Sequence, residues 1–343
     1  MVKLEEIKKN FVISIKRYRA HYKSNHWKRY DDRIKLFKIE NLLNFRNNGL
    51  SNGLDDQKSP IIIKKELSLL SKLINNRFIK KNLLTTNFGN LKNLIKIKKI
   101  FLDSGQLYFI YWLYLLKQNL KKIEYICEIG AGFGGFSAKM IKNYSKAKYL
   151  IIDLPEANFL SSYFLSKNFP NKKILLGYEK KEEIIYKSDF NKYDIIIIPP
   201  WFKIEGIKFD LFINTRSMME MDKEVIFKYF KFIQNNISEK GYFFNVNRYF
   251  KDTVREPLKL TAYPYDNNWN TIISKPSWQQ KHIRILLTQR SKNPKNSISK
   301  ELKKLEKITE KYFLLEKKNK ITFFKKIYYW LKKKLYLIYK FFI

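Results

Sequence analysis

The stretch that decides the fold is Tyr125-Ile-Cys-Glu-Ile-Gly-Ala-Gly-Phe-Gly-Gly-Phe136. Its first five residues form a largely apolar run that predicts a buried strand. Its glycines then predict a tight turn into a helix that reaches about residue 144. A second apolar run, Tyr149-Leu-Ile-Ile-Asp153, ends in an acid. A strand, a glycine turn, a helix and a strand ending in an acid form the layout of a nucleoside-binding crevice in an open α/β sheet.

The spacing inside this stretch argues against a dinucleotide. The dinucleotide turn follows G-x-G-x-x-G, whereas here Glu128 precedes an alternating run, Gly130-x-Gly132-x-Gly134. An acid at this place would repel a pyrophosphate, and it suits a ligand with an ammonium and a sulfonium. The pattern resembles motif I of class I S-adenosylmethionine (SAM) methyltransferases, and the acid ending the next strand favours a ligand site over a plain connecting turn. The candidate cofactor-binding residues are Glu128, Gly130, Gly132, Gly134, Asp153 and Leu154.

Length and cysteine content indicate the class of protein. With 343 residues, the chain has room for a catalytic domain and a smaller accessory region. Its single cysteine, Cys127, lies inside the first strand and is expected to be a buried apolar residue. One cysteine allows no internal disulfide, and neither a signal peptide nor a transmembrane helix is expected. We therefore expect a cytoplasmic protein.

The formal net charge of +38 arises from 69 Lys and Arg residues against 31 Asp and Glu residues. Taken alone, such an excess would indicate a nucleic acid or an anionic membrane as the partner. The excess is mostly lysine, and it accompanies abundant Ile, Asn, Phe and Tyr along the whole chain, as an AT-rich coding sequence would produce. We therefore expect nucleic acid to be an unlikely partner.

The chain divides into a helical N-terminal cap or substrate region at 1–100, a methyltransferase domain at 101–290 and a basic helical tail at 291–343. Apolar runs predict strands, several of them buried on both faces of a parallel sheet, at 125–129, 149–153, 194–198, 209–213 and 241–246. Helices are expected at 106–119, 135–144, 156–168 and 219–236. Residues 270–274 and 281–288 are expected as an antiparallel pair, and 173–177 as a strand whose place is unclear. The fold predicted is α/β, a Rossmann-like class I methyltransferase sheet with helices on both faces.

Four further stretches together resemble a family of bacterial sugar O-methyltransferases. They are Glu-Ile-Gly-Ala-Gly-Phe-Gly-Gly at 128–135, Ile-Ile-Asp-Leu-Pro-Glu at 151–156, Phe-Ile-Asn-Thr-Arg-Ser-Met-Met-Glu-Met at 212–221 and Asn-Val-Asn-Arg-Tyr at 245–249. Asn87 to Asn90 and Trp278-Gln-Gln-Lys-His282 are also similar to family positions, so the resemblance covers roughly residues 85–290. It implies SAM as cofactor and a sugar hydroxyl as acceptor, in the biosynthesis of cell-surface polysaccharides.

Candidate catalytic and substrate-binding residues follow the later strands. Ligands of open α/β sheets lie outside the carboxyl ends of the strands, and a weakly acidic hydroxyl usually needs a general base. The candidate catalytic residues are Glu220, His282, Asn214 and Arg248. The candidate substrate-binding residues are Arg216, Ser217, Asn245 and Asn247.

Structural explanations compete for both candidate bases. Ser217-Met-Met-Glu220 has the pattern of a capping box, in which serine and glutamate satisfy the first N–H groups of the following helix. His282 titrates near neutrality, but a single histidine on a strand is more often structural. No His, Asp and Glu cluster has recognisable metal-ligand spacing, so no metal site is predicted, although a carboxylate-bound Mg²⁺ is left open.

The segment 323–343 is predicted to form a basic amphipathic helix. Its apolar residues, from Phe324 to Phe342, fall on one arc of a helical wheel, and lysines fall on the opposite arc. Such a helix can lie on an anionic membrane surface, which would make the protein peripheral at the inner face of the cytoplasmic membrane. It can equally pack on its own domain.

Two rival functions stay open at this point. A SAM-dependent RNA methyltransferase is favoured by the charge, but Ile198-Pro-Pro-Trp201 lacks the leading amide or acid that would grip an exocyclic amine. The second rival function is a catalytically silent, membrane-associated binding module with the SAM fold. The sugar, the hydroxyl and the oligomeric state do not follow from the sequence.

Overall fold

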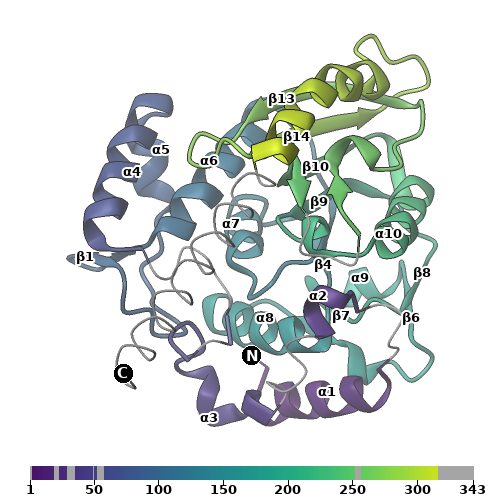
Figure 1. Ribbon diagram of the computed structural model, residues 1–343. Helices are drawn as coiled ribbons and strands as arrows, with labels where there is room; N and C mark the ends of the chain where they lie inside the picture. The colour runs from purple at the N-terminus through teal and green to yellow at the C-terminus, as the bar shows by residue number, and fades with distance from the viewer. Residues whose placement is uncertain are drawn as a thin grey trace, which may run out of the picture.

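A central sheet organises the computed structural model, which describes residues 2–18, 23–28, 35–48, 50–51, 58–251 and 256–315 (Figure 1). Its strands are β3 (Tyr125–Ile129), β4 (Lys148–Ile152), β5 (Ile174–Leu176), β7 (Ile195–Ile198), β9 (Phe209–Thr215), β10 (Ile237–Arg248), β13 (Trp269–Pro276) and β14 (Ile283–Arg290). Their order in space is β13-β14-β10-β9-β3-β4-β7-β5. The strands from β10 to β5 pair in parallel, whereas β14 is antiparallel to both β10 and β13. The expected antiparallel pair is therefore confirmed.

Helices cover both faces of this sheet, and the predicted Rossmann-like α/β fold is confirmed. The helices are α1 (Leu4–Lys16), α2 (Asn25–Lys28), α3 (Ile39–Leu42), α4 (Pro60–Leu73), α5 (Asn76–Asn82), α6 (Ser104–Asn119), α7 (Gly135–Asn143), α8 (Pro155–Asn168), α9 (Asp189–Lys192) and α10 (Lys223–Asn236), with a further helical stretch at 298–315. Three small two-stranded sheets complete the described elements: β1 (Ile95–Ile97) with β2 (Ile100–Leu102), β6 (Ile184–Tyr186) with β8 (Lys203–Glu205), and β11 (Phe250–Lys251) with β12 (Leu258–Lys259).

Strand β5 lies outside β7, although it comes earlier in the chain. The run 173–177 was expected to be a strand of unclear place, and it forms the edge of the sheet, paired in parallel with β7. β7 itself pairs with β4. In the sheet, β7 therefore lies between β4 and β5, although β5 comes directly after α8 in the chain.

Alternate residues of the strands feed two separate cores. In β7, Ile195 and Ile197 pack with residues of α6, α7 and α8, whereas Ile196 and Ile198 pack with residues of α10. All four side chains are at most 1% exposed. Because each buried isoleucine contributes about 1.5–3 kcal/mol relative to an exposed one, a strand buried on both faces has to be apolar throughout.

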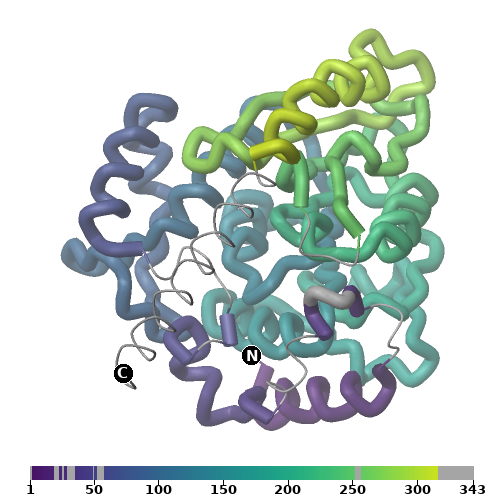
Figure 2. Tube along the Cα trace, viewed as in Figure 1, coloured from purple at the N-terminus to yellow at the C-terminus, as the bar shows by residue number. Residues whose placement is uncertain are grey.

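The N-terminal residues that the structure describes share the core of the sheet. Helix α1 packs along α8, as Figure 2 shows at the lower edge of the molecule. Phe11 of α1 lies 5.0 Å from Phe159 of α8 and 5.4 Å from Phe37, measured between ring centroids. This region therefore forms one wall of the same body that contains the sheet.

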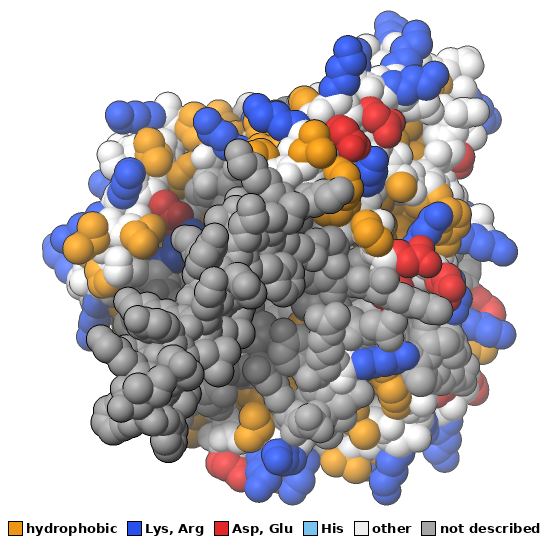
Figure 3. Space-filling model, viewed as in Figure 1, with side chains coloured by type: hydrophobic (Ala, Val, Ile, Leu, Met, Phe, Trp, Pro, Cys, Tyr) orange, Lys and Arg blue, Asp and Glu red, His pale blue; other side chains and the backbone are white. Residues whose placement is uncertain are grey.

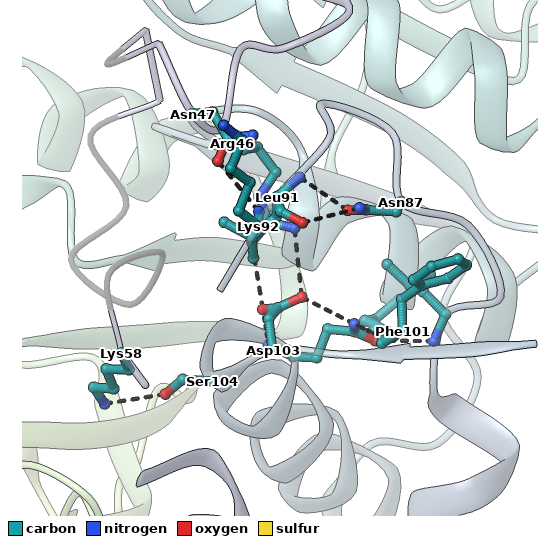
Figure 4. A network of polar contacts seen from close by, with 12 residues as sticks. Arg46, Asn47, Lys58, Asn87, Leu91, Lys92, Phe101, Asp103 and Ser104 are labelled. Carbon is teal, nitrogen blue, oxygen red and sulfur yellow. Dashed lines mark hydrogen bonds and ion pairs between the residues drawn. The ribbon is translucent and has the colours of Figure 1, made fainter. Parts of the chain in front are cut away.

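A buried ion pair joins the N-terminal residues to the start of α6 (Figure 4). Two guanidinium nitrogens of Arg46 each lie 3.4 Å from an oxygen of Asp103. Asp103 also caps α6 by accepting a hydrogen bond from the Gln106 N–H at 3.0 Å. Burial alone would raise the pKa of Asp103, but the charge of Arg46 and the hydrogen bonds from Gln106 and Arg46 hold it below its usual value. The ion pair thus fixes α6, which contributes to the site described next.

Candidate functional site

A cavity of about 440 Å³ opens at the carboxyl ends of the central strands. Its lining comes from the turns that follow β3, β4 and β9, from the start of α8, from Arg248 at the end of β10 and Lys251 of β11, from α6, and from N-terminal residues such as Lys23 and Phe37. The chain places β4 on one side of β3 and returns to place β9 on the other side. Such a reversal of strand order leaves a crevice between the outgoing loops, where open α/β sheets bind ligands.

The glycine turn after β3 needs glycine at two positions for different reasons. Gly130, Gly132 and Gly134 have φ angles of 75°, 59° and 86°, in the left-handed region. A Cβ on Gly130 would lie 1.9 Å from Ser217 Oγ, so this glycine allows the loop after β9 to approach. A Cβ on Gly132 would meet no atom within 4 Å, because this residue borders the cavity. The turn therefore offers bare backbone to a ligand.

Asp153 closes this turn from the neighbouring strand. Its carboxylate accepts hydrogen bonds from the N–H of Gly132 and the N–H of Leu154, both at 2.8 Å. Burial raises the pKa of Asp153 to about 7, although these two hydrogen bonds oppose the shift. Asp153 and Leu154 both line the cavity, and each carboxylate oxygen keeps a further lone pair for a donor there.

Glu128 lies behind the turn instead of in the cavity. Its side chain is 1% exposed and accepts hydrogen bonds from Ser137 Oγ and Tyr149 OH, both at 2.6 Å. Burial raises the pKa of Glu128 to about 7, and both hydrogen bonds oppose this. The side chain joins β3, α7 and β4, and it does not line the cavity. Glu128 therefore lies under the glycine turn and outside the cavity lining, and its contact with a cofactor stays a prediction.

The loop after β9 does not contain the expected capping box. Residues Met218–Glu220 form a short 3₁₀ helix, Ser217 makes no capping hydrogen bond, and α10 begins only at Lys223. The physical reason lies in two buried amides. Asn214 Oδ1 accepts the Met218 N–H and Asn247 Oδ1 accepts the Met219 N–H, both at 3.0 Å. These amides satisfy the first two N–H groups of the 3₁₀ helix, and the Glu220 N–H, which a capping-box serine would bond, donates to the Ser217 carbonyl at 2.9 Å.

Three asparagines that were expected at the site form a buried network behind it. Asn214, Asn245 and Asn247 are 0% exposed. Asn247 Nδ2 donates to Asn214 Oδ1 at 2.9 Å and to Asn245 Oδ1 at 2.5 Å, and Asn214 Nδ2 donates to the carbonyl of Ile129 at 2.8 Å. None of the three lines the cavity. Their predicted contacts with substrate are corrected to a positioning role, because their strand positions turn them away from the cavity.

Four other predicted residues do lie at the cavity: Arg216, Ser217, Glu220 and Arg248. Arg216 has a positive φ of 62°, and its guanidinium carbon lies 5.5 Å from the centroid of the Tyr108 ring. Glu220 Oε1 lies 3.6 Å from Lys251 Nζ. The structure thus brings the Glu220 carboxylate together with the cations Arg216, Arg248 and Lys251 at the cavity.

His282 stands next to this cluster without lining the cavity. Its side chain is half-buried, and its backbone carbonyl accepts the Tyr249 N–H at 3.0 Å. Burial lowers the pKa of His282 to about 4, and the charges of Arg248 and Arg216 lower it further in the same direction. The imidazole is therefore neutral near pH 7, and it is a weaker base than its residue type suggested.

Several cavity residues were not expected from the sequence. Lys23 donates to Glu156 Oε1 at 2.5 Å, and both line the cavity together with Lys251 and Trp112. Glu156 lies in the Asp-Leu-Pro-Glu stretch and could have been found there. Lys23 precedes the glycine turn by more than a hundred residues, and no local pattern marks it.

The described residues show neither a cluster of metal ligands nor a membrane-spanning helix. Within residues 2–315 as far as they are described, no group of three or more His, Cys, Asp or Glu side chains is placed to hold a metal ion. No helix in that part of the chain combines the length and the apolar character needed to cross a membrane. On the face drawn in Figure 3, Lys and Arg side chains are scattered around the periphery among hydrophobic and acidic ones. The predicted helix at 323–343 lies outside the described residues.

Comparisons with known proteins give fold neighbours at low similarity. No family model matches the sequence, and a search of the curated proteins found no match. Among solved structures, the pyocyanin biosynthetic protein PhzM is similar at 8% identity over 55% of this chain and 58% of its own, with a TM-score of 0.35. The mitomycin 7-O-methyltransferase MmcR is similar at 10% identity, over 55% of this chain and 57% of its own, with a TM-score of 0.35.

A third structure, the glycopeptide N-methyltransferase MtfA complexed with SAM, is similar at 9% identity over 52% of this chain and 86% of its own, with a TM-score of 0.34. The matches thus span less than two thirds of the first two proteins. Similarity at this level does not establish a shared activity, so the function has to be argued from the residues of the cavity.

Proposed function

We propose that this chain is a SAM-dependent methyltransferase that methylates a sugar hydroxyl. The observation that carries the proposal is the pairing of the Gly132 backbone with the Asp153 carboxylate at the reversal point of the sheet. The open space beside Gly132 admits a ligand against bare backbone, and the acid beside it can accept hydrogen bonds from a ribose.

The residues of this half of the cavity fit SAM. Its volume lies within the range of small-molecule sites. Asp153 would hold the ribose hydroxyls, and the Gly130–Gly132 backbone would face the remainder of the nucleoside. Apolar side chains such as Phe133, Leu154 and Leu160 give the base a surface to pack against. When bound, SAM supplies a methyl group on a sulfonium, which needs no metal ion to be transferred.

The opposite half of the cavity would receive the acceptor. Glu220 lies at the cavity beside Lys251, and Arg216 and Arg248 also line the cavity. As the hydroxyl oxygen forms its bond to the methyl carbon, its proton has to leave. Of the two bases predicted from the sequence, Glu220 lines the cavity and His282 does not, so Glu220 is the proposed acceptor of this proton.

Binding and transfer test the proposal separately. Isothermal titration of the full-length protein with SAM should show one site, and labelled SAM should transfer methyl groups to members of a panel of nucleotide sugars and lipid-linked glycans. Absence of SAM binding would overturn the proposal. Methyl transfer to RNA but to no sugar would instead support the rival function, an RNA methyltransferase, which the net charge favours.

The base is tested by Glu220→Gln. Since the variant keeps the shape of the side chain, SAM affinity and thermal stability should stay the same, while turnover should fall by about 10²–10⁴-fold. Glu224→Gln is the matched control, because Glu224 is an exposed residue of the first turn of α10. Equal turnover in the two variants would remove Glu220 from the role, and His282→Ala would then be measured.

The cellular setting follows from the sequence resemblance. We propose a cytoplasmic enzyme of bacterial cell-surface polysaccharide biosynthesis, held at the inner membrane face by residues 323–343. Sedimentation with anionic vesicles should retain the full-length protein at low salt and release it at high salt, because salt screens the attraction. Full-length protein that stays in the supernatant at low salt would end the membrane proposal.

A further inference from the structure

The described lining of the cavity carries more positive than negative side chains. Three of its residues are acids and four are cations. The cations are Lys23, Arg216, Arg248 and Lys251. The two lysine side chains are at most 9% exposed, and each lies next to a carboxylate, that of Glu156 in one case and that of Glu220 in the other. The two arginines are half-buried, and because they line the cavity, a ligand inside it can reach them.

These two arginines lie at neighbouring strand ends. Arg216 follows β9 directly, and Arg248 is the last residue of β10. The two strands pair in parallel as far as Thr215 and Val246, and the Arg216 N–H donates to the Val246 carbonyl at 2.7 Å. The charges of both arginines lower the pKa of His282, so both guanidinium groups lie near the same imidazole. Two positive charges at adjacent strand ends repel each other, and an anion bound by both offsets this repulsion.

The backbone and the side chain of Arg216 are both held in place. Its φ of 62° lies in the left-handed region, which residues other than glycine rarely adopt. Its guanidinium carbon lies 5.5 Å from the centroid of the Tyr108 ring, and the Tyr108 hydroxyl in turn accepts a hydrogen bond from Lys58 Nζ at 3.1 Å. Strained backbone of this kind is concentrated at binding and active sites. Arg216 is therefore a candidate ligand contact on the evidence of its backbone as well as its charge.

The chemistry of the two arginines selects a class of ligand. A guanidinium presents a planar fork of donors that binds a carboxylate or a phosphate through two parallel hydrogen bonds. A neutral hydroxyl cannot accept such a pair of charge-assisted bonds. The site is also separate from the acid assigned to the ribose, because Asp153 follows β4, and β3 lies between β4 and the strands β9 and β10.

We propose that Arg216 and Arg248 form an anion-binding subsite of the cavity, and that it selects acceptor sugars that carry a carboxylate or a phosphate. This inference rests on the proposed function, because it assigns the acceptor of the same cavity. It also narrows that function, since a neutral sugar lacks the group that the subsite recognises.

Inorganic phosphate is the probe for this subsite. Isothermal titration of the full-length protein, with S-adenosylhomocysteine present and in about 0.3 M NaCl to screen exposed charges, should show one phosphate site in the wild type. Arg216→Gln and Arg248→Gln should each weaken phosphate binding about tenfold or more, because each removes charge-assisted hydrogen bonds. The affinity for S-adenosylhomocysteine should be unchanged in both variants.

Arg290→Gln is the matched control. Arg290 also lies over an aromatic ring, 5.1 Å from the centroid of Trp269, but it pairs with Asp266 and does not line the cavity. The control loses the same charge, so its phosphate affinity should equal that of the wild type. Absence of phosphate binding to the wild type would overturn the subsite. So would a loss in the two cavity variants no greater than in Arg290→Gln, because the general positive charge of the protein would then hold the anion.

Three sugars identify the source of the anion. Methyl glucuronide carries a carboxylate and glucose 1-phosphate carries a phosphate, so we expect them to displace inorganic phosphate, whereas neutral methyl glucoside should not. Displacement by only one of the charged sugars would support the subsite and assign it to that group. Displacement by neither would overturn the assignment of the subsite to a sugar.

Two further outcomes separate this inference from the proposed function. SAM has a carboxylate of its own, and the two arginines would belong to it if both cavity variants lost S-adenosylhomocysteine affinity and the complex bound no phosphate. That result would overturn the subsite and keep the methyltransferase. Phosphate and sugar binding that depends on Arg216 and Arg248, in a protein that does not bind S-adenosylhomocysteine, would support the subsite and overturn the methyltransferase proposal.

Discussion

The carboxyl ends of β3 and β4 and those of β9 and β10 border the same cavity, but they present different groups to it. On the first side, backbone and the Asp153 carboxylate face the cavity. On the second side, the three asparagines of the strands, Asn214, Asn245 and Asn247, face the other way and are fully buried. A polar residue at a strand end is therefore a ligand contact or a scaffold residue according to the face on which it falls.

Strand parity explains this difference. Asn214 follows Phe212 at an interval of two, and Asn245 and Asn247 follow Phe243 at the same parity. Both phenylalanines belong to the core against α10. Successive side chains of a strand point to opposite faces, so the three amides had to lie on the α10 side. There they hold the 3₁₀ helix that presents Glu220.

The largest expected effect compares two glycines of the turn. Gly130→Ala should destabilise the protein by about 3–5 kcal/mol, because a left-handed alanine costs about 1–2 kcal/mol and the new methyl overlaps Ser217. Gly132→Ala has only the cost of a left-handed alanine, because its methyl group projects into the cavity and meets no atom. It should stay folded and lose SAM affinity. Urea unfolding and titration of both variants check this, and equal destabilisation would contradict the different roles assigned to the two glycines.

The second prediction concerns the amide network. Asn247→Leu removes the partners of the Met219 N–H, Asn214 Oδ1 and Asn245 Oδ1, and it should cost about 2–4 kcal/mol of unfolding free energy. SAM affinity should change little, whereas the KM for the acceptor should rise as the loop loosens.

Asn236→Leu is the control for this change, since Asn236 makes one hydrogen bond at the end of α10. It should cost less than 1 kcal/mol. A loss of SAM affinity in Asn247→Leu as large as the loss of acceptor affinity would show that the two sides of the cavity are not separable.

The third prediction uses the pH dependence of Glu128. Its folded pKa of about 7 lies above the value of 4.5 in an unfolded chain, so the folded protein keeps a proton that the unfolded chain loses. The stability contributed by this group is therefore present below about pH 4.5 and falls as pH rises through 7. Glu128→Gln does not titrate, and relative to the wild type it should gain about 1–3 kcal/mol between pH 5 and pH 8. Exposed Glu239→Gln should show no such gain in urea unfolding.

The smallest effect is expected at Asp153. Its pKa of about 7 means that the carboxylate forms fully only above neutrality, so SAM affinity should rise with pH through 7 and level off by about pH 8. Asp153→Asn should bind SAM about tenfold more weakly at pH 8, a loss of about 1.4 kcal/mol, and its affinity should not vary with pH. Calorimetric titration at pH 6, 7 and 8 measures both. A wild-type affinity that is flat over this range would contradict the role of the carboxylate.

The sequence was sufficient for the elements whose signals are local. The strand at 125–129 was predicted with its bounds, and the helix after the glycine turn was placed to within one residue. The capping-box pattern did not predict the local structure, because Asn214 and the distant Asn247 bond the Met218 and Met219 N–H groups and the loop forms a 3₁₀ helix. The direction of the Glu128 side chain could not be predicted either. Its partners Ser137 and Tyr149 come close only when α7 and β4 pack on β3. Long-range packing decides which way such side chains face.

The position of β5 has a consequence for the order in which the protein is made. During synthesis, β5 leaves the ribosome before β7, yet β7 separates it from the rest of the sheet. Residues 174–176 therefore have to wait for about twenty more residues before they can join their neighbour. Until then the nascent chain exposes the edge of β4 and an unpaired apolar segment, which are sites for mispairing with other chains. This edge of the sheet is therefore open to mispairing until residues 195–198 have been made.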